Sequence, residues 1–358
     1  MQQPLVTLRG IKKHFPVGSG LFGKKSSFVK AVDGVSLDIY PGETVGLVGE
    51  SGCGKSTTGR MVVGLTEPTE GEIYFEGRKL SDYKKKKEIG KNLQMIFQDP
   101  YSSLNPRMTA SDIIEEPLVL HKMGTKSERR KRVDELLERV GLSSDHGNRY
   151  PIEFSGGQRQ RLGIARALAL QPKLIVCDEP VSALDVSIQA QILNLLKEIQ
   201  KDMGLSYLFI AHGIQAVKHI SDKIAVMYLG KIIEFSEKEE MFITPKHPYT
   251  KALLSAVPHP DPKQRDRERI ILKGDLPSPS NPPEGCSFHT RCPVAIEQCK
   301  KVIPTLLQTS EHSFTACIQY ENVGNQVEII AEQEINENYD KLYTESNDKR
   351  KMESVLPN

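Results

Sequence analysis

The residues best suited to chemistry lie in one glycine-rich segment. It reads Gly49, Glu50, Ser51, Gly52, Cys53, Gly54, Lys55 and Ser56, followed by Thr57, and it fits the pattern G-x-x-x-x-G-K-[ST] in full. Glycines let backbone N–H groups approach a polyphosphate closely, and a following helix N-terminus adds partial positive charge. The Lys55 side chain would reach the outer phosphates, and the Ser56 hydroxyl would bind Mg²⁺. The segment therefore predicts a site for a nucleotide such as ATP.

An acidic pair, Asp178 and Glu179, supplies the second half of such a site. It follows the apolar run 174–177. Asp178 would orient Mg²⁺ through water, and Glu179 would polarise the water that attacks the γ-phosphate. An Asp-Glu pair after an apolar strand is more often a surface turn. The glycine-rich segment earlier in the chain favours the catalytic interpretation here.

Strands and helices alternate around these candidate residues. Apolar runs at 44–48, 174–177 and 207–211 predict strands, whereas residues 127–140, 158–170 and 187–201 predict helices. This alternation implies an α/β fold with parallel strands, in which ligands gather at the carboxyl ends of the strands. We expect residues 105–170 to form a helical subregion.

A short motif before the second apolar run carries a family resemblance. The segment reads Phe154, Ser155, Gly156, Gly157 and Gln158, and it resembles the signature motif of ATP-binding cassette (ABC) ATPases, with Phe154 where Leu is usual. The resemblance implies a P-loop ATPase domain at 1–240, with a RecA-like core, an antiparallel β subdomain and a helical subdomain. It also implies that the motif completes the nucleotide site of a second, identical or homologous ATPase subunit. A serine N-cap followed by flexible glycines is the alternative explanation.

Further residues match this family by position. Gln98 resembles the glutamine loop that contacts Mg²⁺ and the attacking water, Asp185 the D-loop, and His212 the switch histidine that senses the γ-phosphate. Gly213 stands where the family commonly has Asp, which puts local interface contacts in doubt. Phe15 matches the aromatic residue that stacks on adenine, although packing in the core explains it nearly as well. The catalytic residues implied are Lys55, Gln98, Glu179 and His212.

Three stretches resemble the ATPase subunits of oligopeptide, dipeptide and nickel importers: residues 97–107, an extended loop between Phe15 and Ala31, and the C-terminal segments 247–254 and 285–293. The resemblance implies an ATPase that energises import of oligopeptides or dipeptides through two separate membrane permease subunits, supplied by an extracytoplasmic peptide-binding protein. Nickel or another solute is an alternative cargo. A soluble ABC ATPase of DNA repair or translation, or an exporter ATPase, is a different alternative, although neither a long coiled-coil insertion nor a second cassette is seen.

Four cysteines cluster late in the chain, at Cys286, Cys292, Cys299 and Cys317. Four thiolates can hold a [4Fe–4S] cluster or a tetrahedral Zn²⁺ ion, and their spacing does not decide between these. Importers of this group can carry such a cluster here, so the resemblance favours iron and sulfur. Four unligated thiols remain the alternative.

Composition places the chain among globular proteins. It has 358 residues and a formal net charge of +2, so no net field argues for nucleic acid as a partner, and we interpret Lys84–Lys87 as a solvated face. No apolar run reaches the 18 residues of a membrane-spanning helix, and the first 17 residues lack a secretory signal pattern. We therefore expect a cytoplasmic location, and the importer resemblance implies a peripheral protein at the cytoplasmic face of the membrane. Proline-rich residues 241–320 predict a small irregular extension, and acidic residues 321–358 a disordered tail.

Overall fold

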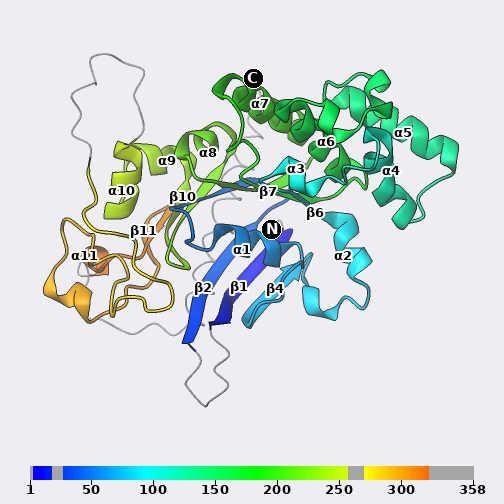
Figure 1. Cartoon of the computed structure of the whole chain (residues 1–358). Coiled ribbons are helices and arrows are strands. Elements are labelled where there is room, and N and C mark those ends of the chain that lie inside the picture. The colour runs from blue at the N-terminus through cyan, green and yellow to red at the C-terminus, as the bar shows by residue number, and fades with distance from the viewer. Residues whose placement is uncertain (1–2, 18–26, 257–269, 322–358) are drawn as a thin grey trace, which may run out of the picture.

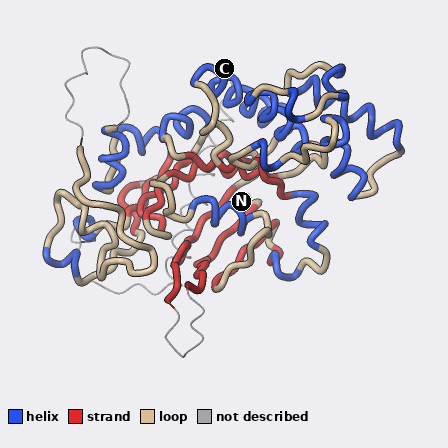
Figure 2. The backbone as a smooth tube through the Cα atoms, viewed as in Figure 1, coloured by secondary structure: helices blue, strands red, loops and turns tan. Residues whose placement is uncertain are grey.

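The computed structural model describes residues 3–17, 27–256 and 270–321 (Figure 1). It contains two β-sheets, one of eight strands and one of four. Helix α1 (Lys55–Val62) packs between them and contacts both sheets, whereas α7 (Val186–Met203) and α8 (Ile214–Ile220) cover the opposite face of the larger sheet (Figures 1 and 2). The architecture is therefore layered, with the larger sheet in the middle.

The larger sheet holds the predicted parallel strands. Its order is β11-β12-β10-β9-β3-β8-β7-β6, and the five strands from β9 to β6 run parallel. Its strands are β3 (Thr44–Val48), β6 (Leu93–Ile96), β7 (Leu174–Asp178), β8 (Ser206–Ala211), β9 (Lys223–Tyr228), β10 (Lys231–Glu237), β11 (Leu307–Ser310) and β12 (Ser313–Thr315). The α/β fold predicted from the sequence is confirmed.

The central strands are buried on both faces, which explains their uninterrupted apolar sequences. In β8, Tyr207 and Phe209 belong to the hydrophobic cluster that includes α7 and α8. Leu208 and Ile210 alternate with them and belong to the cluster that includes α1. Because each strand is fixed from both sides, the loops at its carboxyl end start from rigid positions.

The smaller sheet is antiparallel and has the order β2-β1-β4-β5. Its strands are β1 (Val6–Val17), β2 (Ser27–Ile39), β4 (Glu70–Phe75) and β5 (Arg78–Lys79). The extended loop expected between Phe15 and Ala31 is shorter than predicted, because β1 and β2 continue to pair as far as Val17 and Ser27. Residues 18–26 lie outside the described part of the chain.

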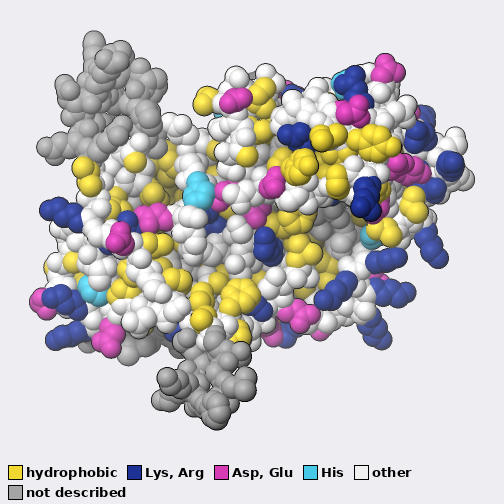
Figure 3. All heavy atoms as spheres, viewed as in Figure 1, with side chains coloured by type: hydrophobic (Ala, Val, Ile, Leu, Met, Phe, Trp, Pro, Cys, Tyr) yellow, Lys and Arg dark blue, Asp and Glu magenta, His cyan; other side chains and the backbone are white. Residues whose placement is uncertain are grey.

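A group of helices at one end of the sheet forms the predicted helical subdomain (Figure 1). It comprises α3 (Pro100–Ser103), α4 (Ala110–Leu120), α5 (Lys126–Arg139) and α6 (Gly156–Leu168). Capping boxes begin α4 at Thr109 and α5 at Thr125, so the backbone N–H groups of each first turn find local acceptors. The lysine run at 84–87 is exposed around the start of α2 (Lys86–Asn92), and Figure 3 shows many Lys and Arg side chains at this end of the molecule.

The C-terminal extension is mostly loop between residues 270 and 306 but is tied to the larger sheet. Strand β12 pairs with β10, and β11 pairs with β12. Its helices are α9 (Lys238–Ile243), α10 (Pro248–Ser255) and α11 (Ile318–Glu321). The proposed division of the chain at residue 240 stays a prediction, and the acidic segment 322–358 lies outside the described residues. Within the described ranges, the helices are all too short or too polar to cross a membrane.

Candidate nucleotide site

The glycine-rich segment forms a loop between β3 and α1. Lys55 is the first residue of α1, and its Nζ atom donates hydrogen bonds to the carbonyl oxygens of Gly49 (2.8 Å) and Glu50 (3.0 Å). Gly54 has φ of 107°, and a Cβ atom there would lie 2.0 Å from the Ala31 carbonyl oxygen. Only glycine therefore fits at this position.

The loop opens onto a cavity of about 190 Å³. Its lining comes from the phosphate loop, from the ends of β6, β7 and β8, and from β2 of the smaller sheet. It is lined by Ala31, Ser51, Gly52, Gly54, Lys55, Ser56, Thr57, Gln98, Glu179 and His212. A cradle of backbone N–H groups with one lysine beside it is suited to a polyphosphate.

A serine and an aspartate form the candidate magnesium site. The Ser56 hydroxyl donates a 2.7 Å hydrogen bond to Oδ1 of Asp178, which is 3% exposed. Burial raises the pKa of Asp178, and the hydrogen bond from Ser56 counters that rise. Hydroxyl and carboxylate oxygens are ligands that Mg²⁺ prefers, so these two residues fit the ion that the glycine-rich motif implies.

Glu179 is held by two of the other expected catalytic residues. Gln98 Nε2 donates a 2.8 Å hydrogen bond to Glu179 Oε2, and His212 Nε2 lies 3.1 Å from Glu179 Oε1. Glu179 is only 5% exposed and has φ of 47°, a strained value for a residue with a side chain. The structure thus brings together residues from the ends of β6, β7 and β8, as parallel pairing requires.

The segment that resembles the ABC signature motif lies away from this cavity, at the start of α6. Ser155 is the N-cap of α6 and forms a capping box with Gln158. The serine N-cap that the sequence analysis gave as an alternative explanation of this motif is therefore present. A Cβ atom on Gly157 would lie 2.6 Å from Ile188 Cγ2, which places the segment against the start of α7. Asp185, the N-cap of that helix, is exposed. Residues 155–158 and Asp185 do not line the cavity of their own chain.

Three further residues named in the sequence analysis are Phe15, Cys53 and Phe154. Phe15 lies on β1 and is 41% exposed, which excludes the alternative that it packs in the core. Cys53, within the phosphate loop, is 1% exposed, and burial raises its pKa. Phe154, where the family usually has Leu, is buried and meets the His146 ring edge-on at 5.9 Å.

Three contacts of the loop were not anticipated. The Ala31 carbonyl faces Gly54, the Tyr249 hydroxyl accepts a hydrogen bond from the Glu50 N–H group (2.9 Å), and Arg291 Nη1 lies 2.9 Å from Glu50 Oε2. Tyr249 and Arg291 belong to the two C-terminal segments that carry the importer resemblance. The importer resemblance singled out these two segments in the sequence, but it did not indicate that Tyr249 and Arg291 contact the phosphate loop.

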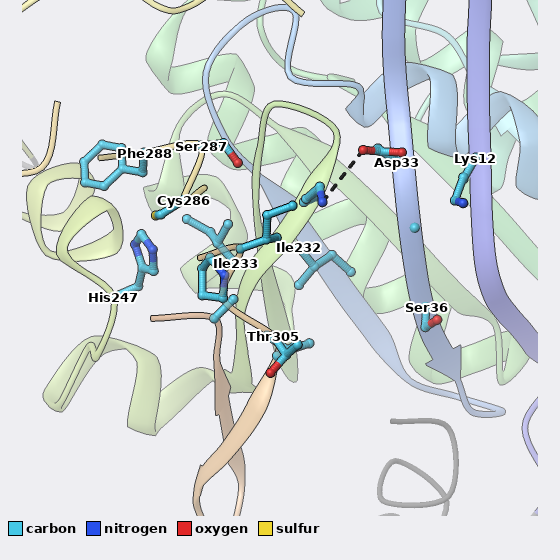
Figure 4. Close-up of a pocket in the computed structure, with 16 residues that line it drawn as sticks. Lys12, Asp33, Ser36, Ile232, Ile233, His247, Cys286, Ser287, Phe288 and Thr305 are labelled. Atoms are coloured by element: carbon cyan, nitrogen blue, oxygen red, sulfur yellow. Dashed lines mark ion pairs between the residues drawn. The ribbon is translucent and has the colours of Figure 1, made fainter. Parts of the chain in front are cut away.

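A second cavity, of about 400 Å³, lies between the smaller sheet, β10 and the extension (Figure 4). His247, Cys286 and Phe288 line it from the extension, and Lys12 and Asp33 line it from β1 and β2. Lys231 pairs with Asp33 at 3.7 Å. The extension therefore packs close to both sheets.

The metal centre expected on the four cysteines is not supported. Among the described residues, no three His, Cys, Asp or Glu side chains form a group that could hold a metal ion. The Cys286 thiol interacts electrostatically with the other three cysteines, so all four share one neighbourhood. However, Cys286 and Cys292 pack against the hydrophobic core, and burial raises the pKa of Cys286 to about 11. In this structure these two thiols serve as small apolar groups.

Comparison with known families defines the class of protein. Residues 32–182 match the sequence model described as "ABC transporter", and residues 233–299 match "Oligopeptide/dipeptide transporter, C-terminal region". The chain resembles the dimeric structure of the ATP-binding cassette MJ0796 bound to ADP and Pi, with a TM-score of 0.58 and 32% identity, covering 65% of this chain and 98% of that one. The fold and the first match define an ABC ATPase.

Two similar proteins show to which group of ABC ATPases the chain belongs. The oligopeptide transport ATP-binding protein AppF of Bacillus subtilis (strain 168) is 56% identical over 323 residues, covering 89% of this chain and 98% of that protein. The dipeptide transport ATP-binding protein DppF of Haemophilus influenzae is 50% identical over 316 residues, covering 88% and 96%. The chain belongs to this family of peptide-transport ATP-binding proteins. Such subunits are ATPases coupled to transport, which disfavours an ATPase of DNA repair or translation.

Proposed function

We propose that this chain hydrolyses ATP to drive the import of oligopeptides or dipeptides through separate membrane permease subunits. One observation carries the catalytic part: the buried Glu179 carboxylate is held by Gln98 and His212 at the mouth of the phosphate cradle. The match of residues 233–299 to the oligopeptide and dipeptide transporter region supports the cargo class.

The positions of the site residues support the following roles. The loop from Gly49 to Thr57 would bind the phosphates, with the Lys55 ammonium group turned from the loop carbonyls toward them. Ser56 and Asp178 would hold Mg²⁺, which neutralises phosphate charge when bound. Glu179 would accept a hydrogen bond from the attacking water and hold it in line with the γ-phosphate. Phe15, exposed on β1, would stack on the adenine ring.

The complete site would need a second ATPase subunit. Ser155, Gly156, Gly157 and Gln158 lie outside the cavity of their own chain, and the similar cassette MJ0796 has a dimeric structure. The N-terminus of α6, with Asp185 beside it, would therefore face the nucleotide of the partner subunit. Two permease subunits would dock on this ATPase pair at the cytoplasmic face of the membrane, with an extracytoplasmic peptide-binding protein delivering the cargo.

The variant Glu179→Gln tests the catalytic assignment. It keeps the size of the side chain but removes the charge that polarises water, so we expect the ATP turnover rate to fall at least about 100-fold while ATP stays bound. Size-exclusion chromatography with ATP should show the variant trapped as a dimer with itself or with a homologous ATPase. Undiminished hydrolysis would refute the role of Glu179.

Glu43→Gln is the matched control. Glu43 is also a largely buried glutamate, 11% exposed and paired with Lys223 at 2.8 Å, but it lies at the opposite end of β3 from the phosphate loop. We expect its turnover rate to match the unaltered chain. Cargo is tested separately, by uptake of labelled dipeptides and oligopeptides in cells that lack and then regain the chain. Uptake that does not depend on the chain would refute peptide import.

A further inference from the structure

Two residues of the C-terminal extension form hydrogen bonds with Glu50 of the phosphate loop. The backbone N–H group of Glu50 donates a 2.9 Å hydrogen bond to the Tyr249 hydroxyl, and its carboxylate accepts a 2.9 Å hydrogen bond from Arg291 Nη1. These partners lie 199 and 241 residues further along the chain. The backbone and the side chain of Glu50 are therefore both bonded to residues of the C-terminal extension.

The Tyr249 hydroxyl has a fixed position. Tyr249 is fully buried, and its ring meets the rings of Tyr228 and Phe288 edge-on at 4.9 and 5.4 Å. Its backbone N–H group donates to His247 Nδ1 (3.0 Å), and the His247 N–H group donates to the buried Glu234 carboxylate (3.0 Å). This chain of contacts anchors the start of α10 to β10. The hydroxyl is thus presented to the loop by a rigid support.

Arg291 is equally constrained. Its side chain is 10% exposed, and its partner Glu50 is 27% exposed, so solvent screens this ion pair less than a surface pair. The Arg291 backbone N–H group donates to the Phe288 carbonyl at 3.0 Å, which links it to the aromatic cluster that supports Tyr249. The two contacts with Glu50 therefore come from one packed unit.

Glu50 in turn organises the loop. Its carbonyl oxygen accepts hydrogen bonds from Lys55 Nζ (3.0 Å) and from the backbone N–H group of Cys53 (3.3 Å). A displacement of Glu50 would move both the lysine that reaches the phosphates and the turn whose N–H groups line the cradle. The extension thus acts on the phosphate site through Glu50.

We propose that Tyr249 and Arg291 are positioning residues that hold the phosphate loop of this chain in the shape that binds nucleotide. The proposal rests on the proposed function only in taking ATP as the ligand. A loop that is already ordered loses less conformational freedom when phosphate binds, so the extension raises nucleotide affinity. Among the described residues, Glu179 bonds Gln98 and His212 but neither Tyr249 nor Arg291, so the chemical step should not change.

The variant Tyr249→Phe in the full chain tests this role. It removes the hydroxyl and keeps the ring in its aromatic cluster. We expect the Kd for ATP and for ADP to rise about two- to tenfold, the value of one net hydrogen bond, because both nucleotides use the same loop. The kcat at saturating ATP should stay within about twofold of the unaltered chain. A merely structural role would lower thermal stability without separating KM from kcat.

Tyr207→Phe is the matched control. Tyr207 is also fully buried and donates its hydroxyl hydrogen bond to a backbone carbonyl, that of Leu196 at 3.0 Å, on the α7 face of the sheet. It should lose similar stability but keep the Kd for both nucleotides. Equal rises in Kd in Tyr249→Phe and Tyr207→Phe would overturn the proposal, since they would reflect loss of stability alone.

Variants of Arg291 test the positioning role independently. Arg291→Gln should weaken binding of both nucleotides, and Arg291→Lys, which keeps the charge, should recover part of the affinity. If Tyr249→Phe and Arg291→Gln both bind ATP as tightly as the unaltered chain, the positioning role is refuted while the ATPase assignment stands. If the unaltered chain itself neither binds nor hydrolyses ATP, the proposed function fails instead.

Discussion

Ser56 and Asp178 share a 2.7 Å hydrogen bond although they lie 122 residues apart in the sequence. Ser56 is in the first turn of α1, and Asp178 ends β7, two strands away from the strand that precedes the phosphate loop. Because Asp178 is buried, its carboxylate needs this partner when no cation is bound. The bond therefore keeps together the two side chains that would hold Mg²⁺.

We expect Ser56→Ala to impair Mg²⁺-dependent hydrolysis. The substitution removes one direct ligand, so the rate at limiting Mg²⁺ should fall at least about 100-fold and recover in part at high Mg²⁺. Hydrolysis rates measured over a series of Mg²⁺ concentrations report this shift. Ser206→Ala is the control, since this buried serine bonds the Gly42 N–H group and the Tyr40 carbonyl at the amino end of β8. An unchanged Mg²⁺ requirement in Ser56→Ala would contradict the site.

Lys55→Ala should weaken ATP binding by about 10- to 100-fold. The ammonium group supplies charge-assisted hydrogen bonds to phosphate oxygens. Among the described residues, no other lysine or arginine lines the cavity. Isothermal titration with ATP measures the change. Lys173→Ala removes a half-exposed lysine paired with Glu76, at the start of β7, and should leave the affinity unaltered.

The core of the fold and most of the cavity could be predicted because their signals are local. Strands β3, β7 and β8 are short apolar runs; β3 leads into the phosphate loop, and β7 and β8 lead directly to Glu179 and His212, which line the cavity. Parallel pairing then brings the strand ends together without further information. Gln98 was placed through resemblance alone, yet it lies at the end of β6, next to β7, as the topology requires.

The contacts of the extension could not be predicted in the same way. The hydrogen bond between Glu50 and Tyr249 joins residues 199 apart through a segment with no regular period, so no pattern indicates which side chains meet. The cysteines show a further limit: their spacing allows a metal centre and all four share one neighbourhood, but among the described residues no three His, Cys, Asp or Glu side chains form a group that could hold a metal ion. Cys286 and Cys292 instead pack against the core. The sequence does not fix the burial of side chains in a loop segment, so this packing could not be predicted.

Two glycines in helices should respond in opposite ways to alanine. In α6, a Cβ atom at Gly163 would meet nothing within 4 Å, so Gly163→Ala should raise the free energy of unfolding by about 0.5–1 kcal/mol through helix propensity. In α1, a Cβ atom at Gly59 would lie 2.7 Å from Ile210 Cδ1 and 2.8 Å from Val176 Cγ1.

Gly59→Ala should therefore lower the free energy of unfolding by about 1–3 kcal/mol, since overpacking outweighs the same gain in propensity. Urea denaturation of the two variants measures both effects. If both substitutions moved stability in the same direction, the packing between α1 and the larger sheet would differ from the structure described here.

His247 should make the fold sensitive to mild acid. Its ring is fully buried, and burial lowers the pKa to about 3 from an ordinary value of 6.5. Above pH 6.5 the ring is neutral in both the folded and unfolded chain. Below pH 6.5 the unfolded chain takes up a proton that the folded chain refuses, so this group lowers the free energy of unfolding by about 1.4 kcal/mol per pH unit, or about 2 kcal/mol at pH 5.

The variant His247→Asn isolates this contribution. Asparagine can accept the Tyr249 N–H hydrogen bond as an N-cap, as His247 Nδ1 does, but it does not titrate. The neighbouring Glu234, whose pKa burial raises, and the nearby Lys251 are present in both proteins, so their contributions cancel in the difference. Urea denaturation at pH 7.5 and pH 5 should show a smaller loss of stability in the variant. Parallel losses in the two proteins would mean that the His247 ring does not stay neutral in the folded chain.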